Sequence, residues 1–274
     1  MDSLVDERNP RPVGGARMLV TELRRLGEVE APATLRVAVL TDLGLGDAYF
    51  TLVTPLGAVY VAHNGNGVSA VRRGESDAAF EALFRAEHGR SAWRMDEPPE
   101  RLVSALTRAL AGMDHPALRF DLRGLSEFER AVLLKALEIP RGEVRPYAWI
   151  AREIGRPGAV RAVGSALGRN PVPLFIPCHR VVRSDGQMGQ YSLGGTNAKR
   201  VMLAAEGLAP DALEELARAG TRYIGCVTTH VYCFPTCRHA RRVAEPHQVA
   251  FGSEAAATAA GYRPCEACRP ARAS

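Results

Sequence analysis

The sequence predicts an α+β fold: a small antiparallel-sheet domain at the amino-terminal side, a mostly helical winged helix-turn-helix-like domain in the middle, and a small α+β domain at the carboxyl end. Three observations predict this. Turn sequences interrupt β-rich runs between residues 49 and 71, a capping box opens a helical stretch at Ser126, and five of the six cysteines lie in the last 49 residues. With 274 residues, 46% of them hydrophobic, the chain can form two or three packed domains.

The amino-terminal half predicts an antiparallel meander followed by two helices. Turn sequences rich in Pro, Gly and Asn stand at residues 54–57 and 64–67, where Gly and Asn tolerate positive φ. Helices are expected over 76–88, with Ser76 as N-cap, and over 99–111. Together these elements predict one α+β module.

The middle of the chain predicts a helix-turn-helix. The capping box Ser126-x-x-Glu129 opens a helix with an apolar face. Pro146 can occupy the first turn of the next helix, residues 155–158 form a turn, and a further helix covers 159–167. That helix carries the small residues Ala162, Gly164, Ser165 and Ala166. Small residues let a backbone approach a crowded groove, although packing between helices selects them too.

Residues 177–182 read Pro-Cys-His-Arg-Val-Val, and this run holds the first candidate nucleophile, Cys178. A thiol reacts as the thiolate, and neighbouring cationic or proton-accepting groups lower its pKa. Here the neighbours are His179 and Arg180. Most isolated cysteines are buried apolar fillers, and neighbours in sequence need not face each other, so the pair alone leaves a packing role open.

The distribution of charge favours a nucleic-acid partner. The whole chain has a net charge of +5. Residues 1–119 carry 14 basic and 16 acidic side chains, net −2, whereas residues 120–207 carry 13 and 8, net +5. Within residues 145–200 the count is 9 against 2. The positive field therefore coincides with the reactive motif, which a generic solvated basic face has no reason to do.

Several separated motifs resemble the O6-alkylguanine-DNA alkyltransferase family, the methylated-DNA–protein-cysteine methyltransferases. They are the run Arg161-Ala-Val-Gly-Ser-Ala-Leu-Gly-Arg-Asn-Pro-Val-Pro-Leu-Phe-Ile-Pro-Cys-His-Arg-Val-Val182, then Gly189-Gln-Tyr-Ser-Leu-Gly-Gly195 and Ala204-Ala-Glu-Gly207. The motifs occur in the family's order and at near-family spacing. The resemblance is strongest over 122–207 and weaker over 36–112.

The resemblance implies a single-turnover DNA repair activity. In the family, a nucleotide carrying O6-alkylguanine is rotated out of double-stranded DNA. Cys178 would take the alkyl group, His179 would take the thiol proton through a water, and Glu206 would orient the histidine. Asn170 matches a hinge residue between the recognition helix and the site. By themselves, Glu206 would be a solvated helix-end glutamate and Asn170 a helix-stop residue before proline. No group in the sequence could hydrolyse the thioether product, so each molecule would act once.

The DNA contacts of the family fall on two elements. Arg161 matches the arginine that fills the hole left by the extruded base, and Tyr147 matches the tyrosine that helps to rotate the target phosphate. A phosphate contact or a solvated charge for Arg161, and packing for Tyr147, remain open. Tyr191 and Ser192 match a loop that contacts the flipped guanine. Leu193 is an extra residue in this loop and bears on the size of the alkyl group accepted. The groove-facing small residues would be Ala162, Gly164 and Ser165.

The carboxy-terminal cysteines have metal-ligand spacing. The pattern Cys233-x3-Cys237-x27-Cys265-x2-Cys268 supplies four soft ligands in two pairs, which suits tetrahedral Zn2+. Residues 222–270 resemble the metal-binding domain of Ada, in which the first ligand cysteine accepts methyl from a DNA methylphosphotriester. By that match Cys233 is a possible second methyl acceptor, and a purely structural zinc module is the alternative. The sixth cysteine, Cys226, falls outside the spacing and is expected to be a packing residue.

These predictions divide the chain into five parts. They are a flexible tail (1–35) with a helix candidate over 16–26, an alkyltransferase N-terminal α+β domain (36–115), a helix-turn-helix DNA-binding alkyl-acceptor domain (120–207), a linker (208–221) and an Ada-like zinc-binding domain (222–274). No apolar run reaches the roughly 18 residues of a membrane span, and acidic residues and prolines near Met1 do not match a signal peptide. We expect a cytoplasmic monomer that acts on double-stranded DNA and has no membrane partner. In Ada the zinc domain is joined to a transcription module, and the segment between Gly207 and Tyr223 is too short to hold one. No transcriptional role is therefore expected.

Two other function classes remain open. A non-enzymatic sensor of alkylated DNA, with a purely structural zinc module, would resemble the binding-only relatives, but these lack the acceptor cysteine and Cys178 is present. A Cys-His hydrolase would turn over repeatedly, and it would need an acyl pocket and an oxyanion hole that the sequence does not indicate.

Overall fold

The computed structural model describes residues 33–271 and confirms the predicted α+β class. Its helices are α2 (Ala33–Asp42), α3 (Asp77–His88), α4 (Glu100–Ala111), α5 (Glu127–Leu137), α6 (Tyr147–Glu153), α7 (Val160–Gly168), α8 (Gly195–Ala205), α9 (Pro210–Arg218) and α10 (Glu254–Ala259), with the 3-10 turns η1 (Cys178–Arg180), η2 (Ala240–Arg242) and η3 (Glu245–His247). Its strands are β1 (Asp47–Thr54), β2 (Gly57–Asn64), β3 (Gly67–Arg72), β4 (Ala92–Arg94), β5 (Arg145–Pro146), β6 (Val181–Val182), β7 (Tyr223–Cys226), β8 (Val231–Cys233), β9 (Gln248–Phe251) and β10 (Arg263–Pro264). The helix candidate over 16–26 lies outside the described residues.

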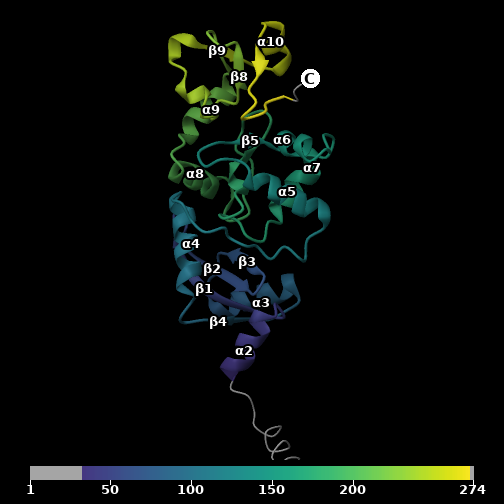
Figure 1. The fold of residues 1–274 in the computed structure, drawn as a ribbon, viewed down its shortest axis with the longest axis vertical. Coiled ribbons are helices and arrows are strands. Elements are labelled where there is room, and N and C mark those ends of the chain that lie inside the picture. Colours follow the sequence, from purple (N-terminus) through teal and green to yellow (C-terminus); the bar gives the residue numbers. More distant parts are fainter. Residues whose placement is uncertain (1–32, 272–274) are drawn as a thin grey trace, which may run out of the picture.

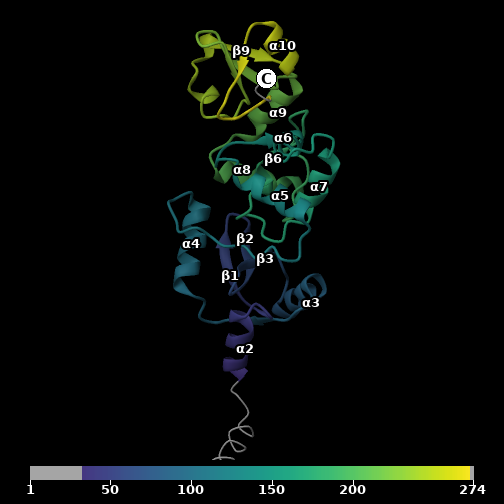
Figure 2. The same ribbon diagram turned by 45° about the vertical axis from the view of Figure 1, so that its right-hand side comes forward.

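These elements follow one another along the long axis of the molecule. The β1–β4 sheet lies at one end, α5 to α8 lie in the middle, and the β7–β10 sheet lies at the other end, as Figure 1 and the turned view in Figure 2 show. Among the described residues, no helix is both long and apolar enough to cross a membrane.

The first sheet has the strand order β3-β2-β1-β4. The pairs β1–β2 and β2–β3 are antiparallel, which confirms the predicted meander, while β4 joins β1 in parallel and was not predicted. Successive side chains of a strand face opposite sides of a sheet. Accordingly, Tyr49 packs with Phe80 and Phe84 of α3, while Phe50 belongs to the large core shared with the helical middle. The sheet thus has a core on each face.

The predicted helix boundaries are confirmed by their capping contacts. The Ser76 side chain accepts from the Ala79 N–H at the start of α3, and α4 ends at Gly112 in the left-handed conformation. The capping box of α5 is present in both directions between Ser126 and Glu129. Local sequence signals therefore set these helix ends.

A buried polar cluster ties the first sheet to the segment that precedes α5. Asn64 Nδ2 donates to Asp47 Oδ1 at 2.9 Å and to Asp121 Oδ2 at 2.8 Å. Arg90 lies at 3.1 Å from the Asp121 carboxylate and also pairs with Asp47. Because both carboxylates are buried and satisfied, this cluster fixes the sheet against the helical middle.

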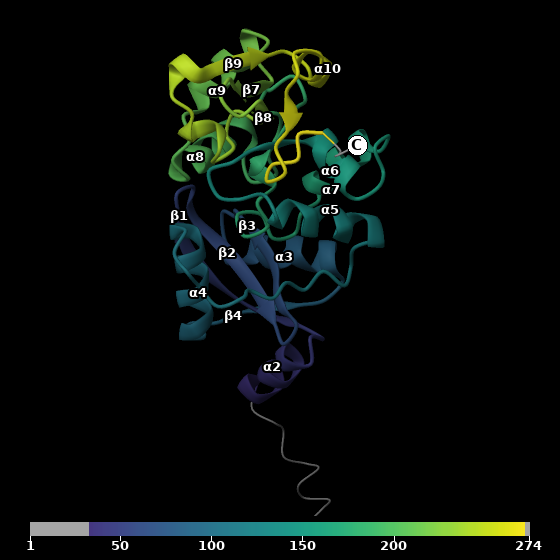
Figure 3. The same ribbon diagram turned by 45° about the horizontal axis from the view of Figure 1, so that its top comes forward.

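The segment expected to be a linker holds helix α9. Leu208 and Leu213 pack on a small apolar cluster that includes Val182 and Leu203, so residues 208–213 lie against the middle of the molecule. Beyond α9, the second sheet has the order β10-β8-β7-β9. The yellow segment that follows β10 runs down to α6 (Figure 3). There the Trp149 Nε1–H donates to the Cys268 carbonyl at 3.1 Å.

Candidate functional site

Cys178 opens the turn η1 at the end of a loop that leaves α7, and only 5% of it is exposed. Asn170 Nδ2 donates to Cys178 Sγ at 3.2 Å and to the Ile176 carbonyl at 2.9 Å, while its Oδ1 accepts from the Val172 N–H at 3.0 Å. One amide therefore braces the loop and presents a donor to the sulfur. Burial raises the pKa of the Cys178 thiol, and the Asn170 hydrogen bond and the Lys199 charge oppose that rise. A base is needed to produce the thiolate at neutral pH.

The adjacent imidazole is held by a buried carboxylate. His179 Nε2–H donates to Glu206 Oε1 at 2.7 Å. Because the carboxylate only accepts, the neutral ring has its lone pair on Nδ1, which has no hydrogen-bond partner among the described residues. Arg180 donates to the two Glu206 oxygens at 3.0 and 2.8 Å and to the Ile139 carbonyl at 2.7 Å. The Gly142 N–H completes the set, at 3.0 Å from Oε2.

The charge states of this pair suit proton transfer. Burial lowers the pKa of His179, and Glu206 only partly offsets the change. Burial alone would raise the pKa of Glu206, but hydrogen bonds from His179 and Arg180 lower it to about 2. At neutral pH the site therefore holds a neutral imidazole on an ionised carboxylate. The structure brings Cys178, His179, Glu206 and Asn170 together, and their catalytic roles stay predictions.

Sequence reasoning missed Lys199, which is fully buried on α8. Its Nζ donates to the Val181 carbonyl and lies 5.9 Å from the centre of the Tyr147 ring. Burial lowers the pKa of Lys199 to about 8, opposed by its interaction with Cys178. The periodicity of α8 could have revealed it, because Lys199 shares the buried face of Met202 and Leu203.

Helix α7 turns its predicted DNA-contacting residues outward. Arg161, Ala162 and Ser165 are exposed and Gly164 is partly exposed. Tyr147 opens α6 and is partly buried, with its ring near Gly164. The exposed face of α7 and the sulfur of Cys178 are thus joined by the short segment that contains Asn170.

The loop predicted to contact guanine lies between the first sheet and the helical middle, where Ser192 and Leu193 line a cavity. Tyr191 is 5% exposed and its ring meets the His179 ring edge-on, with centres 5.8 Å apart. Ser192 is exposed, and the extra residue Leu193 is buried. The loop therefore places Tyr191 against the imidazole, while the exposed Ser192 side chain is close enough to Cys178 for its hydrogen bond to lower the pKa of that thiol.

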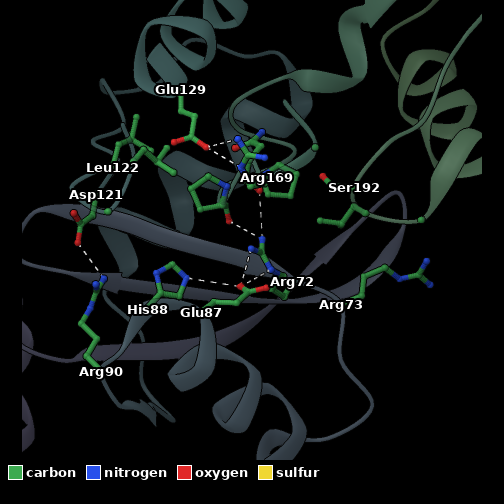
Figure 4. Close-up of a pocket in the computed structure, with 18 residues that line it drawn as sticks. Arg72, Arg73, Glu87, His88, Arg90, Asp121, Leu122, Glu129, Arg169 and Ser192 are labelled. Atoms are coloured by element: carbon green, nitrogen blue, oxygen red, sulfur yellow. Dashed lines mark hydrogen bonds and ion pairs between the residues drawn. The ribbon is translucent and has the colours of Figure 1, made fainter. Parts of the chain in front are cut away.

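A cavity of about 780 Å³ lies beside this loop, between the first sheet and the helical middle (Figure 4). Ser192 and Arg73 are among the residues that line it. The other arginines that line it are paired with carboxylates: Arg72 with Glu87, Arg90 with Asp47 and Asp121, and Arg169 with Glu129. These ion pairs offset most of the positive charge that lines the cavity.

A candidate metal centre lies in the carboxy-terminal unit. The sulfur atoms of Cys233, Cys237, Cys265 and Cys268 all lie within 4.8 Å of one another, and each cysteine is buried. Four soft donors in this arrangement fit the tetrahedral preference of Zn2+, and a bound cation would hold them as thiolates.

The prediction that Cys226 is a packing residue is wrong. Cys226 is partly exposed at the end of β7, and its Sγ lies 3.1 Å from the Thr228 hydroxyl. Hydrogen bonds from Thr228 and Thr229 lower the pKa of Cys226 to about 7. Its position as the last residue of β7, next to the exposed β7–β8 turn, explains the error.

Sequence profiles of two known domains match separate parts of the chain. A sequence profile described as "6-O-methylguanine DNA methyltransferase, DNA binding domain" matches residues 127–208, and one described as "Metal binding domain of Ada" matches residues 214–271. The chain is similar to the methylated-DNA–protein-cysteine methyltransferase of Mycobacterium bovis, with 36% identity over 160 residues, covering 58% of this chain and 91% of the relative. The rat protein of the same name is 46% identical over 101 residues, covering 36% of this chain and about half, 48%, of the relative.

Among solved structures, the chain resembles Mycobacterium tuberculosis OGT in complex with DNA, with 33% identity and a TM-score of 0.49, over 61% of this chain and 99% of that one. The sequence similarity over nearly the whole length of the mycobacterial relative is the decisive finding. This chain belongs to the methylated-DNA–protein-cysteine methyltransferase family.

Proposed function

We propose that the protein repairs O6-alkylguanine in double-stranded DNA by moving the alkyl group irreversibly to Cys178. The observation that carries the proposal is that Cys178, which accepts a hydrogen bond from Asn170, directly precedes His179, whose neutral imidazole is held by Glu206. Family membership makes DNA alkyl repair the activity to which this geometry belongs.

The chemistry balances with the groups in place. The Cys178 proton passes to His179 Nδ1 through a water, and the thiolate attacks the alkyl carbon of the base. A carbon–sulfur bond forms as the carbon–O6 bond breaks. The electron pair of the broken bond stays on the purine, which takes up a proton from solvent and remains in the DNA strand as guanine. The product is a thioether, so the protein acts once.

The exposed face of α7 supplies the DNA contact. A base inside a duplex must be rotated out before a buried sulfur can reach it, and Arg161 would fill the gap that the base leaves. Tyr147 would contact the target phosphate, and Ser192 would contact the extruded base. The exposed face of α7 carries small side chains, which would let its backbone approach DNA closely. They are Ala162, Gly164 and Ser165. The positive charge of residues 145–200 favours DNA, and we propose that the protein acts on it as a monomer.

For the carboxy-terminal unit we propose a Zn2+ site made by the four buried cysteines. Methyl transfer from a methylphosphotriester to Cys233 is a second candidate function, supported by the match of residues 214–271 to the Ada domain. Cys233 is only 4% exposed. Cys178 is equally buried, with 5% exposed, so burial does not decide between methyl transfer to Cys233 and a purely structural zinc site.

Intact-protein mass spectrometry tests the main proposal. The protein is incubated with an excess of duplex that contains one O6-methylguanine, in parallel with Cys178→Ala. We expect the wild type to gain the mass of one methyl group and Cys178→Ala to gain none. Wild-type protein that binds the duplex without a mass gain would indicate a sensor, and product in excess of protein would indicate turnover. Incubating Cys178→Ala with a methylphosphotriester duplex tests Cys233, because a gain of one methyl mass would then indicate a second acceptor.

A further inference from the structure

Four residues, Gly142 to Arg145, lie between the two cysteine centres and are called here the linking segment. On one side the Gly142 N–H donates to Glu206 Oε2 at 3.0 Å. Gly142 has φ of +70°, and a Cβ there would lie 3.1 Å from the Glu206 carbonyl oxygen, so the close approach favours glycine. The far end of the segment, Arg145, pairs with Val181, just after the turn that holds Cys178.

On its other side the linking segment is held by residues 233–238, called here the zinc knuckle. The Val144 N–H donates to Thr236 Oγ1 at 2.9 Å. The Arg238 N–H donates to Glu143 Oε1 at 3.0 Å. Thr236 and Arg238 flank the ligand Cys237 directly. Each contact therefore depends on the backbone path that metal binding at Cys237 would fix.

The contacts between the two sides are buried. Thr236 is 2% exposed, Glu143 3% and Arg145 2%. The Arg145 guanidinium pairs with Glu143 and lies 5.8 Å from the centre of the Trp149 ring and 5.2 Å from that of Phe234. Buried charges and hydrogen bonds of this kind are costly to break, so the linking segment and the zinc knuckle form one packed layer.

We propose that Thr236 is a positioning residue for Glu206, and that the metal-loaded zinc knuckle sets the rate of alkyl transfer at Cys178 through the linking segment. The proposal rests on the alkyl-transfer function proposed above. The zinc knuckle hydrogen-bonds to Val144 and Glu143 and so fixes the linking segment. The linking segment places the Gly142 N–H against Glu206. Glu206 in turn sets the tautomer and orientation of His179. The carboxy-terminal unit would thus act on the repair chemistry without touching the substrate.

The dependence on metal follows from the ligands. Four thiols within 4.8 Å of one another lose their common partner when the cation is removed, and small thiolate sites lose their fold on chelation. The hydroxyl of Thr236 and the N–H of Arg238 would then leave the linking segment. Glu206 would keep its hydrogen bonds from Arg180 but lose the one from the Gly142 N–H. The carboxylate would then orient the His179 ring less firmly.

The test compares Thr236→Val with Thr236→Ser. Valine keeps the shape of the side chain and removes the hydroxyl, while serine restores it. Thr228→Val, at an exposed threonine of the same unit, is the matched control. For each protein we would measure the single-turnover rate of methyl transfer at saturating O6-methylguanine duplex, the affinity for that duplex, and the zinc content.

We expect Thr236→Val to keep its zinc and its DNA affinity and to transfer methyl about tenfold more slowly, as for other losses of ligand-supporting contacts. Thr236→Ser and Thr228→Val should transfer at close to the wild-type rate. In hydrogen exchange, the peptide covering residues 139–146 should exchange faster in zinc-stripped wild type and in Thr236→Val than in zinc-loaded wild type.

A wild-type rate for Thr236→Val would overturn the inference. So would a slower rate that excess zinc restores, or one matched by an equal loss of DNA affinity, since Thr236 would then serve only the metal site or the DNA face. If wild-type protein transfers no methyl at all, the proposed function fails instead, and the exchange of residues 139–146 still reports whether zinc holds the linking segment.

Discussion

The two cysteine centres of this chain are both buried, but they differ in what surrounds the sulfur. Cys178 Sγ accepts from the Asn170 amide and interacts with the buried Lys199 ammonium group, and the next residue, His179, is held by Glu206. The sulfurs of the carboxy-terminal cluster face one another. A thiol of the first kind can be ionised by its neighbours when an electrophile arrives, whereas thiols of the second kind need a cation to exist together as thiolates. Burial alone therefore does not decide whether a cysteine is reactive or structural.

The largest expected effect is a difference in zinc content and stability between variants of the two cysteine centres. Cys265→Ser should lose bound zinc and a large part of the stability of the carboxy-terminal unit, because metal binding to such sites contributes about 10–16 kcal/mol. Cys178→Ser should keep its zinc and its melting temperature. Zinc analysis and thermal unfolding of both variants check this, and equal zinc content in the two would contradict the assignment.

The next effect concerns the base. Glu206→Gln replaces the carboxylate that accepts from His179 and Arg180, so the imidazole loses its fixed tautomer and the rate of methyl transfer should fall about 10²-fold or more. Single-turnover kinetics at saturating duplex measure it. Glu127→Gln, at an exposed glutamate of α5, should react at the wild-type rate. If both variants reacted alike, Glu206 would have no part in the chemistry.

The same carboxylate should make stability depend on pH. The pKa of Glu206 is about 2 in the folded protein, below its ordinary value of 4.5, so its contribution is complete above pH 4.5 and is lost as the pH falls through 2. The difference corresponds to about 3 kcal/mol. Urea unfolding between about pH 6 and pH 3 should show a flatter decline of the unfolding free energy in Glu206→Gln than in wild type. Asp121, whose pKa hydrogen bonds also lower, remains in both proteins as a common background.

The smallest effect concerns the DNA face. Arg161→Ala should weaken repair of a duplex about tenfold, while Arg161→Lys decides between two roles. A lysine restores a phosphate contact but not a planar group that fills the gap of an extruded base. Repair kinetics and duplex affinity of both variants, with Arg218→Ala on α9 as control, measure the difference. Full rescue by lysine would reduce Arg161 to a phosphate contact.

Local signals in the sequence predicted the elements with recognisable ends. The caps at Ser76 and Ser126 and the turns of the meander depend on a few neighbouring residues, and the structure confirms them. The short strand β4 and helix α9 in the expected linker were missed, because strand pairing and helix docking depend on residues far apart in the chain.

The candidate site shows the same limit. Family motifs led to Cys178, His179 and Glu206, but a lysine is ordinarily exposed, so Lys199 was not considered. Nor does any motif show that Thr236 would reach Val144, since 92 residues separate the two positions. Contacts between residues far apart in the chain could not be predicted from the sequence.

Mapping the methyl group to a residue tests the central claim most directly. Wild-type protein is reacted with a duplex that carries one O6-methylguanine, digested, and analysed by peptide mass spectrometry. We expect one methyl group, on the peptide that contains Cys178, and unmodified peptides for Cys226 and the four cysteines of the carboxy-terminal cluster. A methyl group on any of those cysteines instead of Cys178 would contradict that claim.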